Sequence, residues 1–312
     1  MALGSFGEEL VNMNVLIDEQ NQSSTENTLR GIFERPEISF VVNPRLMEWI
    51  LNDSANPLNH IVRAIPDGAV VLDIGAGNGV LARLLRAVGR KVIIDAIEPD
   101  LAAREFSGDL YRKMYECNLE TFLDCSVNNF LRYDIIVMAD VIEHLPNPEP
   151  YLCRLKALLS GEGFLAINTP NIAFLSVRLA LLVGRFDYVD SGILERTHLR
   201  FFTRKTLQQL FSTINLFPIA EFHCLRDPFS TEIPLTGQTI PLSLLLRLTR
   251  DELASVYQFL FFLGTEQCSN VRPLKLGTRG RSLPINYGVR RTFEVFKRLR
   301  ELIQSRFIKN VA

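Results

Sequence analysis

The strongest constraint on this chain is a turn of alternating glycines that follows a short apolar segment. Val70–Ile74 is apolar and β-branched apart from Asp73, which is typical of a buried strand, and three alternate glycines follow within Gly75–Gly79. The next residues, Val80–Arg86, favour a helix. Glycines between a strand and a helix let the backbone approach a ligand closely, and the helix N-terminus offers unpaired N–H groups. The turn therefore predicts a nucleotide-like ligand, with a purely structural glycine-rich turn as the alternative.

The spacing of this motif separates the possible ligands. A dinucleotide-binding turn reads G-x-G-x-x-G, and a phosphate-binding loop carries a lysine after its last glycine. This chain has D-x-G-x-G-x-G without that lysine, which disfavours a nicotinamide oxidoreductase and a P-loop nucleotidase. A second acid, Glu98, ends the apolar run Val92–Ile97 and stands 19 residues after Gly79. A carboxylate at this place accepts hydrogen bonds from both ribose hydroxyls of a nucleoside. The alternative is a solvated acid next to a helix that Asp100 caps.

Strand-like and helix-like segments alternate from about residue 68 to 170, which indicates an α/β fold with helices on both faces of a parallel sheet. The predicted strands are Val70–Ile74, Val92–Ile97, Met114–Cys117, Tyr133–Met138, Phe164–Asn168, Phe217–Leu225 and Tyr257–Leu263. The predicted helices begin at Asn43-Pro44, at Val80, at Glu149 (ending at Leu159, before Gly161) and after Thr203. We expect a doubly wound, seven-stranded, mostly parallel sheet, with ligands beyond the carboxyl ends of its strands.

Taken together, these motifs resemble a known family. Asp73–Gly79 with Glu98 is similar to the nucleotide site of class I S-adenosylmethionine-dependent methyltransferases. Tyr133–Leu145 resembles the fourth strand and following loop of the ubiquinone-biosynthesis O-methyltransferases, and Asn168–Thr203 looks like bacterial methyltransferases found with glycosyltransferases. The resemblance covers about residues 68–264. It implies methyl transfer from S-adenosylmethionine to a small-molecule acceptor, expected to be a hydroxyl of a saccharide, a glycolipid or an aromatic intermediate.

The resemblance also implies a set of cofactor-binding residues at the strand ends. Asn118 stands where these enzymes usually carry an Asp that contacts the adenine. Its amide oxygen is a weaker acceptor than a carboxylate, and a loop position without a ligand is the alternative. The implied cofactor-binding residues are Asp73, Gly75, Gly77, Gly79, Glu98, Pro99, Asn118, Leu119, Ala139 and Asp140.

Three residues are candidates for the chemistry of the acceptor: His144, His198 and Glu143. Methyl transfer to a hydroxyl requires that its proton be removed, and a histidine is the natural base near neutral pH. The alternatives are that His144 is a packed loop residue and that His198 orients a lid. The related ubiquinone enzymes bind a divalent metal with E-x-x-E-H in this loop, where this chain has D-x-x-E-H starting at Asp140. A metal therefore stays an alternative, and no residue is assigned as a metal ligand.

We expect residues 172–202 to form a lid beside the site. Its apolar part, Phe174–Leu182, indicates a channel for a hydrophobic or lipid-linked acceptor, or alternatively packing onto the edge of the sheet. Arg196 and Arg200 are candidates for pairing with a carboxylate or phosphate of the substrate, because arginine forms bidentate contacts with such groups. Surface ion pairs are the alternative for both arginines.

Composition predicts a soluble, cytoplasmic protein around these motifs. Hydrophobic residues make up 47% of the 312 residues and charged residues 22%, which is ordinary for a globular protein. The five cysteines are scattered without a C-x-x-C pair, which favours a reducing compartment and argues against a thiolate zinc site. The longest apolar stretch, Ile172–Gly184, is interrupted by Arg178 and is too short to span a bilayer.

The net charge of −1 hides an uneven distribution. Residues 271–312 contain eleven Lys and Arg against two Glu, so the rest of the chain carries a net charge of −10. We predict a polar N-terminal extension over 1–42, a methyltransferase domain over 43–266, and a linker with a basic amphipathic helix over 267–312. That helix predicts either peripheral membrane contact or docking onto the acidic body. A nucleic-acid substrate is disfavoured because the chain lacks the loop of amino-group DNA methyltransferases. A non-catalytic binding or assembly partner with the same fold is the other alternative.

Overall fold

A computed structural model describes residues 14–16, 42–100, 107–126, 132–229, 231–233 and 239–265. Its main feature is a seven-stranded sheet with the order β4-β3-β2-β5-β6-β9-β7. The parallel strands are β2 (Val70–Ile74), β3 (Ile93–Ile97), β4 (Lys113–Tyr115), β5 (Tyr133–Ala139) and β6 (Leu159–Pro170). The last strand, β9 (Val256–Gly264), is antiparallel to both β6 and β7 (Phe217–Leu225). The expected mostly parallel, seven-stranded α/β sheet is confirmed.

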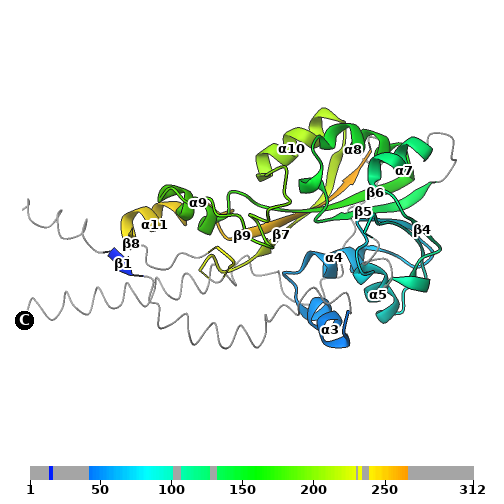
Figure 1. Ribbon diagram of the computed structural model, residues 1–312, viewed down its shortest axis with the longest axis horizontal. Helices are drawn as coiled ribbons and strands as arrows, with labels where there is room; N and C mark the ends of the chain where they lie inside the picture. Colours follow the sequence, from blue (N-terminus) through cyan, green and yellow to red (C-terminus); the bar gives the residue numbers. More distant parts are fainter. Residues whose placement is uncertain are drawn as a thin grey trace, which may run out of the picture.

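Helices cover both faces of this sheet (Figure 1). One face carries α7 (Leu119–Ser126), α8 (Pro148–Lys156) and α10 (Arg204–Thr213), and the other carries α3 (Pro44–Asn52), α4 (Pro57–Ala64) and α5 (Val80–Ala87). Side chains of β2 alternate between the two layers: Leu72 and Ile74 join the first core, and Val71 joins the second. Because both faces are covered, the central strands are mostly apolar on both faces rather than alternating between apolar and polar residues, with Asp73 of β2 and Asp134 of β5 as exceptions.

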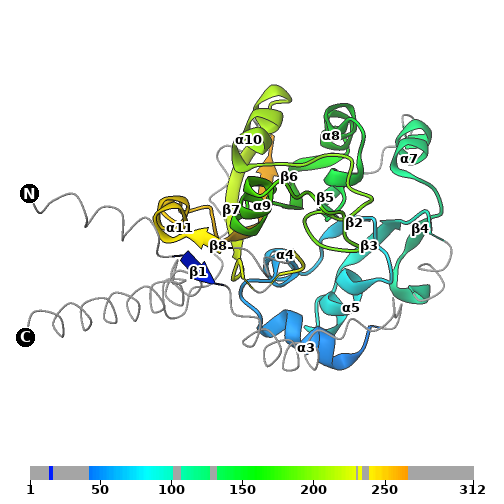
Figure 2. The ribbon, with the colours of Figure 1, turned by 60° about the vertical axis from the view of Figure 1, so that its left-hand side comes forward.

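A third, smaller core lies at the end of the sheet next to β9. It joins α9 (Leu175–Leu182), α11 (Leu242–Leu248) and the loop around Ile193 through buried Phe174, Leu245 and Tyr257. Beside α11, β8 (Thr239–Pro241) pairs with β1 (Asn14–Leu16) in a two-stranded antiparallel ladder (Figure 2). This third core holds the predicted lid against the sheet edge, so much of the lid's apolar surface is used for packing.

Side-chain caps explain where the flanking helices begin. The Asn43 side chain accepts a hydrogen bond from the Leu46 N–H (2.8 Å), and α3 starts at the following proline. Thr203 and Thr206 form a reciprocal capping box at the start of α10. Both predicted helix starts are confirmed, because these signals act within one turn of the chain.

The helix predicted over Glu149–Leu159 is shorter in the structure and is corrected here. It ends at Lys156, and Leu159 already belongs to β6, where it pairs with Tyr133 of β5. Gly161 likewise lies in β6 instead of ending the helix. The reason is tertiary: the Leu158 carbonyl accepts from the Tyr133 N–H (2.9 Å), so a strand backbone competes for residues that could also be helical.

The predicted polar extension over 1–42 and the basic segment over 267–312 lie outside the described residues, apart from Asn14–Leu16 and Val42. The division into three parts and the basic helix therefore stay predictions. Within the described ranges, none of the helices has the length and the apolar character that crossing a membrane requires.

Candidate functional site

The glycine turn lies between β2 and α5 at the carboxyl end of the sheet. Gly75, Gly77 and Gly79 all have positive φ angles, of 70°, 52° and 77°, which L side chains rarely adopt. A Cβ atom at Gly79 would come within 2.7 Å of Leu110 Cδ1, whereas one at Gly77 would meet nothing within 4 Å. The turn is thus packed on one side and open above Gly77, so it has room for a ligand close to the backbone.

Glu98 connects the second predicted motif to this turn. Its carboxylate is only 7% exposed, and it accepts hydrogen bonds from the Gly77 N–H (2.7 Å) and the Asp100 N–H (2.8 Å). These two bonds fix the orientation of the carboxylate beside the open side of the turn. Each oxygen keeps a further lone pair for a ligand. The neighbouring Pro99 is exposed at the same edge.

Asp73 is buried beneath the turn rather than facing it openly. Its side chain accepts a hydrogen bond from the Tyr111 hydroxyl (3.0 Å), and the residue is 4% exposed. Burial raises the pKa of Asp73 to about 7; the Tyr111 hydrogen bond opposes this shift and the Glu98 charge adds to it. Asp73 therefore changes its charge near neutral pH. Tyr111 carried no signal in the sequence, because it reaches Asp73 from the loop before β4.

Asn118 lies at the third strand end and caps a helix. Its Oδ1 atom accepts a hydrogen bond from the Thr121 N–H (2.8 Å) in the first turn of α7. Leu119 next to it is 7% exposed and packs into the first core. Local folding alone accounts for the position of both residues, so their contact with an adenine stays a prediction.

The loop after β5 forms the neighbouring part of the site and contains the short helix η2 (Ile142–His144). Ala139 ends β5, and Asp140 has a φ of 54°. The Asp140 Oδ1 atom accepts hydrogen bonds from Asn168 Nδ2 and Gln258 Nε2, each at 2.7 Å. A Cβ atom at Gly75 would lie 2.8 Å from Val141 Cγ2, so the glycine lets this loop pack directly onto the nucleotide turn.

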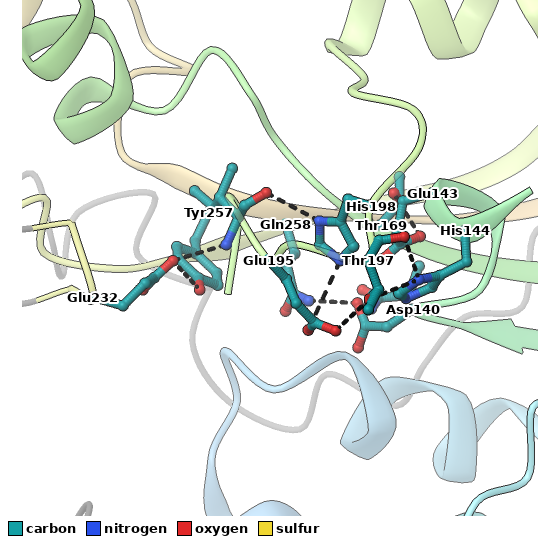
Figure 3. A network of polar contacts seen from close by, with 12 residues as sticks. Asp140, Glu143, His144, Thr169, Glu195, Thr197, His198, Glu232, Tyr257 and Gln258 are labelled. Atoms are coloured by element: carbon teal, nitrogen blue, oxygen red, sulfur yellow. Dashed lines mark hydrogen bonds and ion pairs between the residues drawn. The ribbon is translucent and has the colours of Figure 1, made fainter. Parts of the chain in front are cut away.

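Two predicted catalytic histidines lie side by side here (Figure 3). The rings of His144 and His198 have centroids 4.8 Å apart at an angle of 74°. His198 Nδ1 is 3.0 Å from the Ile193 carbonyl oxygen, and His144 Nδ1 is 3.2 Å from the Thr197 carbonyl oxygen. A carbonyl oxygen only accepts, so both Nδ1 atoms carry the proton and both Nε2 atoms keep a lone pair in the neutral rings. His198 is buried, whereas His144 is partly exposed.

Glu143 is buried behind the histidines and is 1% exposed. Its Oε2 atom accepts from the Thr169 hydroxyl (3.0 Å), while Oε1 has no hydrogen-bond partner among the described residues and lies 4.0 Å from His198 Nε2. Burial, together with the Asp140 charge, raises the pKa of Glu143 well above its usual value, and burial lowers the pKa of His198. Both shifts favour the neutral forms of the two side chains.

The residues of the D-x-x-E-H loop do not surround one position for a metal ion. The Asp140 carboxylate is occupied by two amide groups, and the possible donor cluster is instead Glu143, His144 and His198. The donor atoms of this cluster spread over up to 4.8 Å. Two ligands of one divalent ion such as zinc, each at about 2.1 Å, lie at most about 4.2 Å apart. As placed, the three side chains are too far apart for an ion of this size, but not for a larger cation with bonds of about 2.4 Å. A metal stays the alternative, and we derive no step through it.

Several polar residues around the histidines were not predicted from the sequence. Leu199 and Arg200 donate their N–H groups to the Glu143 carbonyl oxygen (2.8 and 2.9 Å), which joins the lid loop to η2. The polar residues here that were not named as candidates from the sequence are Asn168, Thr169, Glu195, Thr197, Glu232, Tyr257 and Gln258. They come from segments that are distant in the sequence, and no local pattern marks them.

The two lid arginines have protein partners in the structure. Arg196 pairs with Asp190 (2.6 Å) on the surface, and the Arg200 guanidinium donates to the Pro146 carbonyl oxygen (2.7 Å from Nε). The Arg196 contact is the surface ion pair of the alternative, whereas Arg200 has a backbone carbonyl as its partner. A role in binding an anionic group of the substrate stays a prediction.

Comparison with known proteins identifies related sequences. A family described as "Methyltransferase domain" matches residues 48–220. The ubiquinone biosynthesis O-methyltransferase of Glaesserella parasuis serovar 5 is 32% identical over 191 residues, which cover 58% of this chain and 76% of the relative. The enzyme of the same name from Bradyrhizobium diazoefficiens is 28% identical over 160 residues, and the match spans 50% of this chain and only 62% of the relative. A crystal structure of a SAM-dependent methyltransferase from Archaeoglobus fulgidus is 15% identical, with a TM-score of 0.46, covering 70% of this chain and 93% of that one.

Proposed function

The chain belongs to the S-adenosylmethionine-dependent methyltransferase family, and we propose that it methylates a hydroxyl group of a small molecule. The observation that carries the proposal is the pair of histidines next to the nucleotide turn. Their protons are held on Nδ1, so both Nε2 atoms can accept a proton. A base is needed for a hydroxyl acceptor, because the hydroxyl must lose its proton during the transfer.

We place S-adenosylmethionine at the glycine turn. The residues fit this ligand: space is open above Gly77, and the oriented Glu98 carboxylate beside it can accept from both ribose hydroxyls. Asp73 supplies negative charge near the amino-acid end of the ligand. Gly75 and Gly79 shape the turn, and Pro99, Asn118, Leu119, Ala139 and Asp140 complete the proposed cofactor site.

His144 is the residue that we propose to act as the base. When bound, S-adenosylmethionine supplies a methyl carbon on a sulfonium; the acceptor oxygen bonds to that carbon as the carbon–sulfur pair leaves with sulfur, giving S-adenosylhomocysteine. His144 Nε2 takes the hydroxyl proton, because this ring is the more exposed of the two histidines. His198 and Glu143, buried behind it, hold the ring in place and exclude water from its rear side. Val141 packing at Gly75 keeps the base next to the cofactor turn.

We propose an acceptor with an apolar portion. The end of α9 and the following loop expose large apolar side chains, at Leu181 (51%), Leu182 (57%), Val183 (44%), Phe186 (37%) and Tyr188 (54%). Phe186 contacts Tyr188 and Phe201, and the Phe201 ring lies 6.4 Å from that of His198, which connects this surface to the histidine pair. An exposed apolar surface connected to a site favours contact with an apolar group of a ligand. An aromatic or saccharide hydroxyl attached to a hydrophobic tail fits this surface, and the names of the related enzymes agree with an aromatic acceptor.

Calorimetry tests the proposed cofactor. S-adenosylmethionine and S-adenosylhomocysteine are expected to bind, and NAD is not. Binding of NAD alone would overturn the proposal. If none of the three binds, a non-catalytic partner that keeps the fold becomes the better interpretation.

Methyl transfer to probe acceptors tests the proposed reaction. With methyl-labelled S-adenosylmethionine, decylcatechol and decyl glucoside are compared with catechol and glucose. We expect label on a tailed acceptor, and a preference for free glucose would contradict the apolar portion. His144→Gln is expected to lower kcat about 100-fold without changing S-adenosylhomocysteine affinity, in the usual range for loss of a general base. His60→Gln is the matched control and should keep its activity, because His60 lies on α4 and its ring is hydrogen-bonded to the Ser54 carbonyl oxygen.

A further inference from the structure

A carboxylate and a hydroxyl from the lid loop lie in line with the His144 ring. The Thr197 hydroxyl donates to Glu195 Oε1 (2.6 Å), and the same Thr197 oxygen is 3.2 Å from His144 Nδ1 (Figure 3). A carboxylate accepts only, so the hydroxyl proton points to Glu195 and an oxygen lone pair faces His144. That arrangement requires a proton on His144 Nδ1, the same tautomer that the Thr197 carbonyl oxygen requires.

The charge of Glu195 faces the histidine pair. Its Oε2 atom lies 4.0 Å from His198 Nε2, while Oε1 accepts from Thr197. The adjacent Arg196 forms its ion pair with Asp190 and therefore does not neutralise the Glu195 carboxylate. A negative group linked to His144 Nδ1–H through one hydroxyl stabilises the ring when its Nε2 takes up a proton.

From this geometry we propose that the Thr197 side chain and Glu195 are positioning residues for methyl transfer: together with the Thr197 carbonyl they fix the orientation of the His144 ring with a free Nε2, and Glu195 supports its positive charge. The proposal rests on the proposed role of His144 as the base. It follows the general rule that a catalytic base is oriented by a third group on its far side. Neither residue touches the acceptor in this scheme; both act through the His144 ring.

The loop that carries both residues is anchored well enough to position a ring. Glu232 Oε1 accepts from the Ile193 N–H (2.8 Å) and from the Tyr257 hydroxyl (2.9 Å). A Cβ atom at Gly192, where φ is +101°, would overlap that same carboxylate, so any larger residue would displace the Glu232 side chain from this position. The other end of the loop is held by the two backbone bonds to the Glu143 carbonyl.

Substitutions that each remove one part of the Glu195–Thr197–His144 contacts test the proposal. Thr197→Val removes the hydroxyl at nearly constant size, Thr197→Ser keeps it, and Glu195→Gln removes the charge but keeps an acceptor. We expect Thr197→Val and Glu195→Gln each to lower kcat with decylcatechol, or the probe that is methylated, roughly ten-fold, a part of the usual effect of a general base. Acceptor KM and S-adenosylhomocysteine affinity should stay unchanged. Thr197→Ser should keep kcat within about two-fold, and Glu149→Gln on the exposed start of α8 is the control for loss of a surface charge.

A measurement without turnover separates this proposal from the proposed function. Nitrogen-15 NMR of the histidine rings in the full-length protein reports which nitrogen of His144 carries the proton. We expect the Nδ1–H form in every variant, because the Thr197 carbonyl oxygen is kept. The resonance of the Nδ1–H proton should shift in Thr197→Val, which loses the hydroxyl acceptor, and stay in place in Thr197→Ser. An unchanged Nδ1–H resonance in Thr197→Val, or unchanged kcat in both Thr197→Val and Glu195→Gln while His144→Gln is inactive, overturns the proposal. If His144→Gln is itself fully active, the assignment of the base fails, and the change of the Nδ1–H resonance alone then shows whether the Thr197 hydroxyl contacts the ring.

Discussion

The nucleotide turn and the histidine cluster lie at the same edge of one sheet but are built differently. The turn uses backbone groups of five consecutive residues, and Glu98 is the main side chain that completes it. The histidine cluster uses side chains from η2, β6, the lid loop and β9, which are linked by hydrogen bonds. Two of its members, Glu143 and His198, are buried titratable groups. A substitution harms a site made of backbone groups mainly when it removes the main side chain that completes the site. In a side-chain network, a substitution of any residue that holds the network in place is harmful. This contrast leads to four predictions.

The largest effect is expected from Glu98→Ala, which removes the main side chain that completes the nucleotide turn. S-adenosylhomocysteine affinity should fall about 100-fold, or ~2.7 kcal/mol, because hydrogen bonds to a charged acceptor are individually strong. Calorimetry measures the change, and Glu149→Ala on the surface of α8 is the control. Unchanged affinity would mean that the ribose binds elsewhere.

Gly192→Ala should damage the histidine cluster and leave the nucleotide turn intact. The new Cβ atom would overlap the Glu232 carboxylate in a backbone conformation that disfavours alanine. We expect a loss of about 2 kcal/mol in the free energy of unfolding and roughly 30-fold in kcat, with S-adenosylhomocysteine affinity unchanged.

Gly184→Ala is the matched control for this substitution. Gly184 also has a positive φ, of +75°, but a Cβ atom there meets nothing within 4 Å. The difference between the two variants therefore isolates the overlap with Glu232 from backbone strain. Equal loss of kcat in both variants would show that Glu232 does not anchor the lid loop.

The pH dependence of S-adenosylmethionine binding should report the titration of Asp73, the buried acid beneath the nucleotide turn. Because the pKa of Asp73 is raised to about 7, the free protein holds this group protonated below that pH. The positively charged ligand favours the carboxylate, so binding must release a proton below pH 7 and is unaffected above it. Affinity for S-adenosylmethionine should therefore increase up to about ten-fold per pH unit as the pH rises toward 7, and then level off. Asp73→Asn should flatten this profile, and an unchanged slope in that variant would assign the proton to another group.

The smallest effect is expected at Asn118, where the cap and the adenine contact can be separated. Asn118→Asp keeps a good cap for α7 and replaces the amide with a stronger acceptor, so S-adenosylhomocysteine affinity should rise about three-fold. Asn118→Ser also caps the helix but is too short to reach a base, and it should lower the affinity slightly. Identical calorimetry for the wild type and both variants would leave Asn118 as a cap alone.

Elements with local signals were predictable, as particular cases show. The strand Phe217–Leu225, the capping box at Thr203 and the start of α3 agree with the sequence patterns, because each signal acts over a few residues. The end of α8 was not predictable, since Leu158 and Leu159 are taken by pairing with Tyr133. The partners of Asp140 could not be predicted either. Its place in D-x-x-E-H suggested a metal as an alternative, whereas in the structure its carboxylate accepts hydrogen bonds from Asn168 and Gln258.

The sequence by itself determined the α/β fold, the nucleotide turn and the acid that follows it, because those features depend on contiguous residues and on regular strand and helix spacing. Only the tertiary structure decided how the chemistry of the acceptor is organised. It brought the two histidines together, selected their tautomers through the Ile193 and Thr197 carbonyls, and placed Glu195 and Glu232 where they can act on the lid loop. The physical reason is that hydrogen bonds between distant segments depend on how the strands are ordered and how the lid packs on them, and neither leaves a periodic trace in the sequence.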